Sequence, residues 1–157
     1  MSTITYHKAG VADIELLLDQ RVAFLREYWG QPDAAAEAAL RSEMRLYFER
    51  TLPSGEYISW YALADGVVAG VGGMAVLQRP GSFRVADGRC GYIMNMYTPA
   101  PYRRRGIAQS VLDRLVESGR EIGLQFFELH ATQDGEPLYI RNEFQKHGEP
   151  TYRKFFP

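Results

Sequence analysis

Two strand-like segments constrain the fold of this chain more than any other feature. Residues 91–98 form a nearly unbroken apolar run, and residues 125–131 form a second segment of the same kind. Unbroken apolar runs are typical of strands covered on both faces. Between them lies a long helical pattern in which Ile107, Val111 and Leu115 share one apolar face. Strands joined through helices predict a mixed sheet with helices on its faces.

The rest of the chain supplies the remaining elements of such a sheet. Apolar spacing and turn residues predict the order β α α β β β α β α β β. In chain order, we expect a strand at 3–7, a helix from Asp13 to Gly30, a helix from Pro32 to about Pro53, strands at 57–64 and 67–76 around an Asp65-Gly66 turn, the strand 91–98, a helix from 107 to between Gly119 and Gly123, the strand 125–131, a short helix at 136–144 and a final hairpin from Gln145. Gly72-Gly73 predicts a bulge or a close backbone approach within its strand.

Length and charge limit the class of protein. The 157 residues suit one domain spanning 1–157, and an apolar fraction of 46% argues against disorder. The net charge of −1 argues against a dedicated nucleic-acid binder, which needs a surplus of basic residues. Met1 to Gly10 has no apolar run behind a basic start, and the apolar stretches are too short to span a bilayer. We therefore expect a cytoplasmic protein without a membrane partner.

Cysteine and histidine usage excludes several kinds of site. Cys90 is the single cysteine, so neither an internal disulfide nor a thiolate-rich zinc site can form. His7, His130 and His147 lie far apart, and we expect no metal. Cys90 could serve as an acyl-accepting nucleophile. A lone cysteine at the start of a strand is more often a small apolar filler, and we favour that reading.

The segment from Arg103 to Ala108 has the chemistry of an anion site. It lies between a buried strand and the start of a helix, where backbone N–H groups lack partners and the helix dipole is positive. Gly106 lets a phosphate oxygen approach the backbone, and Ala108 keeps the next contact small. The segment contains neither a Walker loop nor a GxGxxG turn. The alternative is a solvated basic turn leading into a core helix.

These residues resemble a known family. Tyr102-Arg103-Arg104-Arg105-Gly106-Ile107-Ala108 matches the [RQ]-x-x-G-x-[GA] signature of the GCN5-related N-acetyltransferases (GNATs). Residues 95–98 resemble the family's fourth strand, and residues 137–144 resemble its L-Y-x-x-x-G-F segment, with 33 residues between Gly106 and Tyr139. The resemblance is strong over residues 91–156 and rests on element order over residues 1–90.

The resemblance implies an α/β fold of mixed type. The expected sheet is mostly antiparallel, with helices on both faces and a splayed parallel pair, 91–98 and 125–131, in its middle. The gap between these strands would admit acetyl-CoA, the implied acyl donor. Its pantetheine arm would pair with the backbone of Met96 and Thr98, and its pyrophosphate would lie on the backbone of residues 104–108. The implied cofactor-binding set is Met96, Tyr97, Thr98, Arg103, Arg104, Arg105, Gly106, Ile107, Ala108 and Thr132.

Tyr139 is the catalytic residue that the resemblance implies. Its phenol is protonated at neutral pH and can donate to the departing sulfur. From its residue type alone, a packing role on an amphipathic helix is the alternative. A backbone N–H within residues 95–98 would stabilise the oxyanion. The base stays open between water, His130 and Glu27, because Asn95 stands where some relatives have a carboxylate and an amide cannot take a proton.

Three positions depart from the family pattern. Glu143 replaces the glycine of L-Y-x-x-x-G-F, Thr132 replaces a common asparagine, and Gly135 replaces a common alanine. Glu143 affects the turn after the helix and therefore the placement of Tyr139.

The function predicted from the sequence is acetyl transfer from acetyl-CoA to the primary amine of a small molecule, or of a peptide, by direct attack in a ternary complex. The alternative is a catalytically inactive acyl-CoA-binding or regulatory module. Tyr28, Trp29 and the loop from Leu77 to Arg89, which includes Phe83, are candidates for the acceptor wall. The resemblance is also compatible with a homodimer, although the sequence shows no interface.

Overall fold

The computed structural model describes residues 3–157. Over these residues the chain forms β1 (Ile4–Lys8), α1 (Ile14–Trp29), α2 (Ala34–Ser54), β2 (Tyr57–Ala64), β3 (Val67–Gln78), β4 (Arg89–Tyr97), α3 (Ile107–Glu121), β5 (Phe127–Leu129) and α4 (Glu136–Arg141), with short 3-10 turns at Val11–Asp13 and Ala100–Tyr102. No helix within residues 3–157 is long and apolar enough to cross a membrane.

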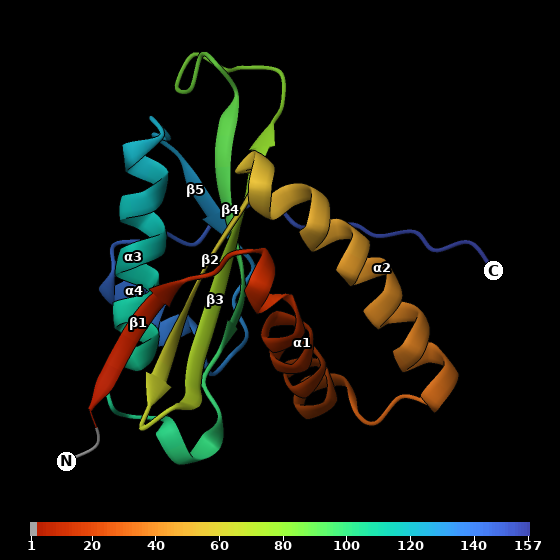
Figure 1. The fold of residues 1–157 in the computed structure, drawn as a ribbon. Helices are drawn as coiled ribbons and strands as arrows, with labels where there is room; N and C mark the ends of the chain where they lie inside the picture. The colour runs from red at the N-terminus through yellow and green to blue at the C-terminus, as the bar shows by residue number, and fades with distance from the viewer. Residues whose placement is uncertain (1–2) are drawn as a thin grey trace.

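The five strands form one mixed sheet in the order β1-β2-β3-β4-β5. Neighbouring strands are antiparallel except β4 and β5, which are parallel. Helices α3 and α4 lie on one side of the sheet, and α1 and α2 lie on the other (Figure 1). The predicted fold class, a mostly antiparallel mixed sheet with a parallel pair and helices on both faces, is confirmed.

The C-terminal hairpin predicted from Gln145 is wrong. Within the described residues no strand follows β5, so the parallel pair lies at one edge of the sheet rather than in its middle. Strand β5 itself has three residues instead of the seven expected. Pro150 has no N–H to donate to a strand ladder, and the segment exposes its aromatic side chains at Tyr152, Phe155 and Phe156. Residues 145–157 are exposed throughout, so this segment has no packing that would hold it against the sheet.

Each face of the sheet has its own apolar core. On the α3 side, Ile107, Val111 and Leu115 of the amphipathic helix pack on Met74 and Ile93 of the sheet. On the other side, α1 and α2 cover a second cluster that includes tyrosines of β2 and β4. These helix layers determine which face of each strand lies near the end of α1 and which lies near the end of α3.

The two consecutive glycines of β3 permit close packing on both faces. A Cβ on Gly72 would overlap the sulfur of Met96 and a methyl of Val111, and a Cβ on Gly73 would overlap the phenol of Tyr57. The close approach predicted from Gly72-Gly73 is therefore confirmed.

Strand β4 contains an irregularity at Asn95. Val71 pairs with Tyr97 and Gly73 pairs with Met94, so three steps along β4 oppose two along β3. This count defines a β-bulge, and Asn95 adopts a positive φ of 56° within it. The bulge bends the second half of β4 before the strand ends.

Helix α4 ends in a Schellman motif formed around Glu143. The Phe144 N–H donates to the Tyr139 carbonyl at 3.0 Å, and the Glu143 N–H donates to the Ile140 carbonyl at 3.1 Å. The rings of Tyr139 and Phe144 pack edge to face, with centroids 5.9 Å apart. Glu143 has a φ of 64°, the left-handed conformation that glycine adopts without strain. The turn of the family motif is therefore kept although its glycine is absent.

We predict that Glu143→Gly stabilises the protein by roughly 0.5–1 kcal/mol, because the relief of left-handed strain exceeds the entropy cost of glycine. Chemical denaturation measures the free energy of unfolding. Glu143→Ala is the control, since alanine keeps the Cβ atom that causes the strain. Equal stabilisation by alanine, or destabilisation by glycine, would contradict this account.

Candidate active site

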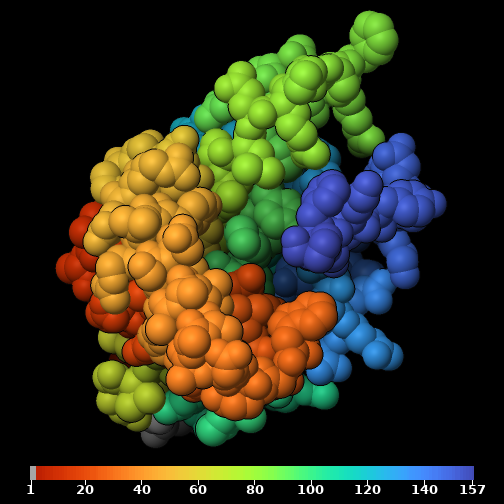
Figure 2. Space-filling view, turned by 90° about the vertical axis from the view of Figure 1, so that its right-hand side faces the viewer, coloured from red at the N-terminus to blue at the C-terminus, as the bar shows by residue number. Residues whose placement is uncertain are grey.

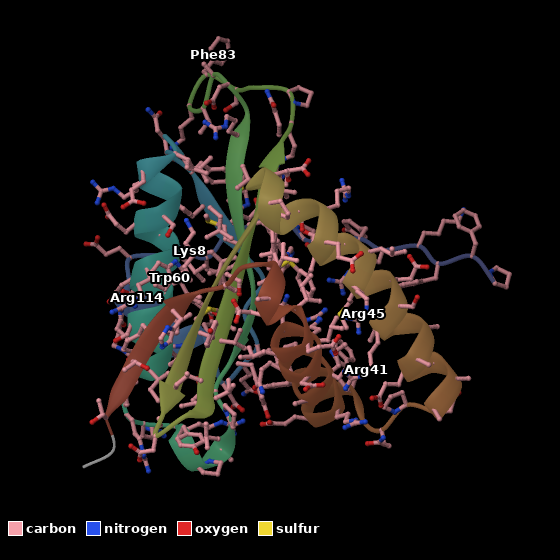
Figure 3. The ribbon with its side chains drawn as sticks, in the orientation of Figure 1. Lys8, Arg41, Arg45, Trp60, Phe83 and Arg114 are labelled. Carbon is pink, nitrogen blue, oxygen red and sulfur yellow. The ribbon has the colours of Figure 1, made fainter. Side chains whose placement is uncertain are left out.

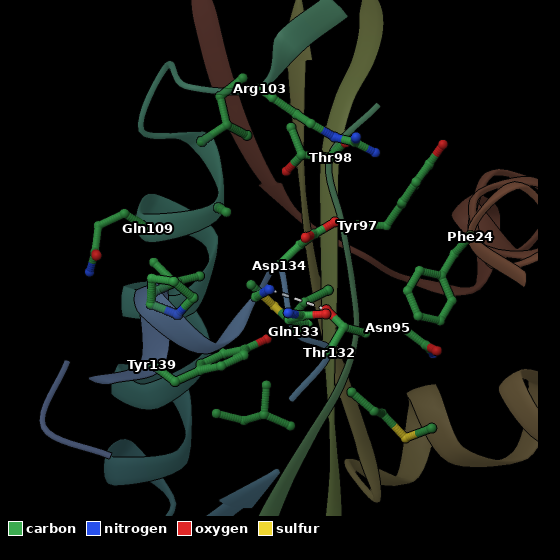
Figure 4. A pocket seen from close by; sticks show the side chains of 18 of the residues that line it. Phe24, Asn95, Tyr97, Thr98, Arg103, Gln109, Thr132, Gln133, Asp134 and Tyr139 are labelled. Atoms are coloured by element: carbon green, nitrogen blue, oxygen red, sulfur yellow. Dashed lines mark hydrogen bonds between the residues drawn. The ribbon is translucent and has the colours of Figure 1, made fainter. Parts of the chain in front are cut away.

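A cavity of about 760 Å³ lies where the parallel strands separate. The β4–β5 ladder ends at the pair Ile93 and Leu129. Beyond it, residues 94–98 on the β4 side, and His130 with residues 132–135 after β5, line the cavity together with the start of α3, helix α4 and the end of α1. In Figure 4, Tyr139 and Gln109 lie on the α3 side of β4, whereas Phe24 and Tyr97 lie on the α1 side. The predicted splay of the two strands is confirmed.

The start of α3 presents backbone donors to this cavity. The first bond within the helix runs from the Ser110 N–H to the Gly106 carbonyl at 3.0 Å, so the N–H groups of Ile107, Ala108 and Gln109 have no partner inside the helix. Gly106 caps the helix in the left-handed conformation, with a φ of 76°. A Cβ built on Gly106 meets no atom within 4 Å, so the space beside this cap is open. This arrangement can receive an anion.

The three consecutive arginines have different roles. Arg103 and Arg104 line the cavity, whereas Arg105 does not, and its guanidinium lies 5.6 Å from the ring centre of Tyr102. The structure therefore does not place Arg105 at the cavity with the other predicted cofactor-binding residues. Arg103 Nε donates to the Thr98 carbonyl at 2.8 Å, and its other end forms an ion pair with Glu27. Glu27 is not among the residues that line the cavity.

Tyr139 is held in α4 with its hydroxyl directed into the cavity (Figure 4). Its side chain is 8% exposed. Burial, together with the nearby phenol of Tyr28, raises the pKa of Tyr139 to about 12. The phenol therefore remains protonated at neutral pH and can act as a hydrogen-bond donor.

Helix α4 is fastened to the start of α3 by two side-chain amides. Gln109 Nε2 donates to Asn142 Oδ1 at 2.6 Å, and Asn142 Nδ2 donates to Gln109 Oε1 at 2.8 Å. Asn142 also donates to the Leu138 carbonyl at 2.7 Å. The turn before α4 is held by Thr132, whose Oγ1 accepts the Gly135 N–H at 3.2 Å. These bonds fix Tyr139 relative to the anion-binding end of α3.

Around this cavity the structure brings together all the predicted site residues except Arg105. Those lining it are Met96, Tyr97, Thr98, Arg103, Arg104, Gly106, Ile107, Ala108, Thr132 and Tyr139. Among the acceptor-wall candidates, Tyr28 lines the cavity, whereas Trp29 and Phe83 do not. Their roles in binding and catalysis stay predictions.

Asn95 places a buried polar group within the bulge of β4. Its Nδ2 donates to the Tyr57 hydroxyl at 2.7 Å. Its Oδ1 is buried and has no hydrogen-bond partner within residues 3–157. Burial raises the pKa of Tyr57, so that phenol stays neutral. Sequence reasoning missed Tyr57 and Phe24, because an aromatic on a strand or amphipathic helix is indistinguishable from an ordinary core residue.

His130 and Cys90 have contrasting positions. His130 lines the cavity, and its ring nitrogens lie 2.6 Å from the Tyr92 hydroxyl and 3.2 Å from Thr151 Oγ1. Cys90 is 1% exposed, lies outside the cavity wall, and has a thiol pKa raised by burial. The geometry thus opposes the reading of Cys90 as a nucleophile.

The sequence matches the model of the Acetyltransferase (GNAT) family over residues 18–148. The chain belongs to the GNAT acetyltransferase family. The recognition made from the signature at Arg103–Ala108 is therefore confirmed, and the protein is an acyltransferase by family. A comparison with curated protein sequences gives no significant match.

Solved GNAT structures share this fold over almost the whole chain. A predicted acetyltransferase from Clostridium acetobutylicum, solved with acetyl-CoA, has 30% sequence identity and a TM-score of 0.88, covering 97% of this chain and 96% of its own. A GCN5-related N-acetyltransferase from Ralstonia eutropha JMP134 has 29% identity and a TM-score of 0.84, covering 97% and 99%. Glucosamine-6-phosphate N-acetyltransferase from Arabidopsis thaliana has 14% identity and a TM-score of 0.73, covering 98% and 99%, and shows the fold alone.

We predict that Gly106→Ala weakens acetyl-CoA binding about tenfold, or ~1.4 kcal/mol, because a methyl group enters the space before the α3 donors. Isothermal titration calorimetry measures the affinity. Gly55→Ala is a matched control, because Gly55 ends α2 with the same φ of 76° and also has no atom within 4 Å of a built Cβ. The control shares the backbone strain but lies outside the cavity wall. Native affinity in folded Gly106→Ala would refute this placement of the anion site.

Proposed function

We propose that residues 1–157 act as one N-acetyltransferase domain, which moves an acetyl group from acetyl-CoA to the primary amine of a small molecule by direct attack in a ternary complex. The observation that carries this proposal is the single cavity that joins the free donors of α3, the bulge of β4 and the hydroxyl of Tyr139. A cytoplasmic location stays a prediction from the sequence.

The residues present fit the acyl donor. The unpartnered N–H groups at the start of α3 and the open space before Gly106 suit a pyrophosphate. The backbone of Met96 and Thr98 lies at the edge that β5 leaves unpaired, where an extended pantetheine arm can be hydrogen-bonded like an added strand. Bound acetyl-CoA supplies an acetyl thioester, whose carbonyl carbon is the electrophile.

The chain's residues then divide the work of the transfer. Backbone N–H groups within residues 95–98 stabilise the charge that develops on the carbonyl oxygen. The Tyr139 hydroxyl donates a hydrogen bond to the departing sulfur. Because its pKa of about 12 exceeds the ~8.5 of an ordinary thiol, Tyr139 keeps its proton while stabilising the negative charge.

A small acceptor is favoured by the rim of the cavity. Tyr28 closes one side from the end of α1, and Thr151 brings the C-terminal segment to His130 on the other. That segment lies on the same face of the molecule as α1 and α2 (Figure 2). A rim bordered by these two segments suits a short amine better than a folded protein.

We predict that Tyr139→Phe lowers kcat by about 10²- to 10⁴-fold, because the sulfur leaves without a donor. Acetyl-CoA affinity remains near that of the wild type, since the phenol contributes little to ground-state binding. Free-thiol release from acetyl-CoA with a panel of amines measures turnover. Tyr152→Phe, which makes the same change on a side chain that is 89% exposed, is the control.

Unchanged turnover in Tyr139→Phe would remove Tyr139 from the reaction. The alternative function, an inactive acyl-CoA-binding module, is favoured by the amide at Asn95, which cannot accept a proton. It would be supported if the wild type bound acetyl-CoA but released no thiol with any amine.

Of the two side chains considered as bases, His130 lines the cavity and Glu27 does not, and we propose that His130 receives the proton of the acceptor ammonium. His130→Gln then lowers kcat/KM at neutral pH by about 10²-fold or more. The loss shrinks as the pH approaches ~10, where amines deprotonate in solution. A defect that is constant across the pH range would assign His130 a structural role.

A further inference from the structure

One arginine interrupts the apolar stripe by which α1 faces the sheet and the cavity. The helical spacing of three and four residues places Leu17, Arg21, Phe24 and Tyr28 on one face. Leu17 belongs to the core cluster between α1 and the sheet, while Phe24 and Tyr28 line the cavity. Arg21 therefore lies between the core and the cavity; it is not itself among the residues that line the cavity, but its guanidinium lies against Phe24, which is.

The surroundings of Arg21 offer no counter-charge. Its guanidinium carbon lies 5.5 Å from the centre of the Phe24 ring, and the phenols of Tyr57 and Tyr92 are near enough to influence its pKa. Burial lowers the pKa of Arg21, as expected for a charge removed from water. Within residues 3–157 the Arg21 side chain forms neither an ion pair with a carboxylate nor a side-chain hydrogen bond. The cation–π contact with the Phe24 ring is the one close interaction that compensates its charge.

The other arginines near α1 are satisfied. Arg26 forms an ion pair with Glu37, Arg41 pairs with Asp19, and Arg45 pairs with Glu15. Figure 3 shows Arg41 and Arg45 between α2 and α1. Among the arginines near α1, Arg21 alone lacks such a partner within residues 3–157.

Each neighbour of Arg21 either lines the cavity on its α1 side or is hydrogen-bonded to a residue that lines it. Phe24 lines the cavity directly, and Figure 4 shows it on the α1 side of β4. The Tyr57 hydroxyl is bonded to Asn95, and the Tyr92 hydroxyl is bonded to His130, both of which line the cavity. The α3 donors lie on the opposite side of β4.

A half-buried guanidinium without an anion has lost hydration that no protein group replaces. A ligand anion that reaches it recovers this energy through charge-assisted, often bidentate, hydrogen bonds. We propose that Arg21 binds an anionic group of the acceptor, so that the acetylated molecule is an amine that also carries a carboxylate or a phosphate. This inference rests on the proposed acetyltransferase function.

Paired acceptors test the anion requirement. Each pair keeps the amine and removes the negative charge: amino acids against their amides, and 2-aminoethyl phosphate against 2-aminoethanol. The wild type is expected to show a kcat/KM about 10- to 100-fold higher for the anionic member of at least one pair. The pair that responds distinguishes a carboxylate from a phosphate.

Variants of Arg21 test whether this residue causes the preference for anionic acceptors. Arg21→Gln should abolish it by raising KM for the anionic acceptor, with kcat for the neutral acceptor and acetyl-CoA affinity unchanged. Arg21→Lys should retain part of it, because the charge remains and the planar fork is lost. Arg120→Gln removes the same charge from an exposed site at the end of α3 and should match the wild type. Thermal unfolding of each variant identifies any loss of folding.

The outcomes separate this inference from the proposed function. If the wild type acetylates neutral amines as well as anionic ones, or if folded Arg21→Gln keeps the preference, the role of Arg21 is overturned while the acetyltransferase function stands. If no amine is acetylated, ligand-observed NMR with the same pairs decides independently of turnover. Binding of the anionic members to the wild type and its loss in Arg21→Gln would support the Arg21 site. Absence of that difference would overturn it.

Discussion

The active-site cavity depends on the failure of β4 and β5 to remain paired. Their parallel ladder covers three residue pairs and stops at Ile93 and Leu129. The bulge at Asn95 then turns the rest of β4, so its backbone faces a cavity instead of a neighbouring strand. Exposed strand edges usually invite aggregation. Here the edge is enclosed by α3, α4 and α1, which makes its hydrogen-bonding groups available to a ligand.

Precision at this cavity comes from contacts between helices rather than from the sheet. The reciprocal amides of Gln109 and Asn142 join the start of α3 to the end of α4. The Schellman motif at Glu143 then packs Phe144 against Tyr139. These contacts fix the position of the Tyr139 phenol relative to the donors at α3. Glu143 tolerates a strained backbone there because the two hydrogen bonds and the aromatic contact outweigh the cost of its conformation.

The sequence predicted the parts of this structure that local chemistry determines. The glycine before α3 and the apolar run before it predicted an anion site at the start of the helix, because helix caps and buried strands have distinct patterns, whereas the place of Tyr139 came from the resemblance to the family. The final hairpin was predicted wrongly because turn residues such as Gly148 and Pro150 mark a change of direction but not a partner strand. The position of Arg105 also escaped prediction, since neighbouring arginines look alike until the turn directs each one.

The residues on the α1 side of the cavity, where we propose that the acceptor binds, could not be predicted from the sequence. Tyr57, Tyr92 and Phe24 belong to three elements far apart in sequence, and each has the periodicity of an ordinary core residue. Arg21 becomes informative only when the fold shows that this arginine has lost water without gaining a carboxylate. The arrangement also separates two anion sites: the N–H groups of α3 lie on one side of β4, and Arg21 lies on the other. A donor rich in phosphate and an anionic acceptor would repel each other if bound together. Binding them from opposite sides leaves the carbonyl and the amine to meet at the Asn95 bulge.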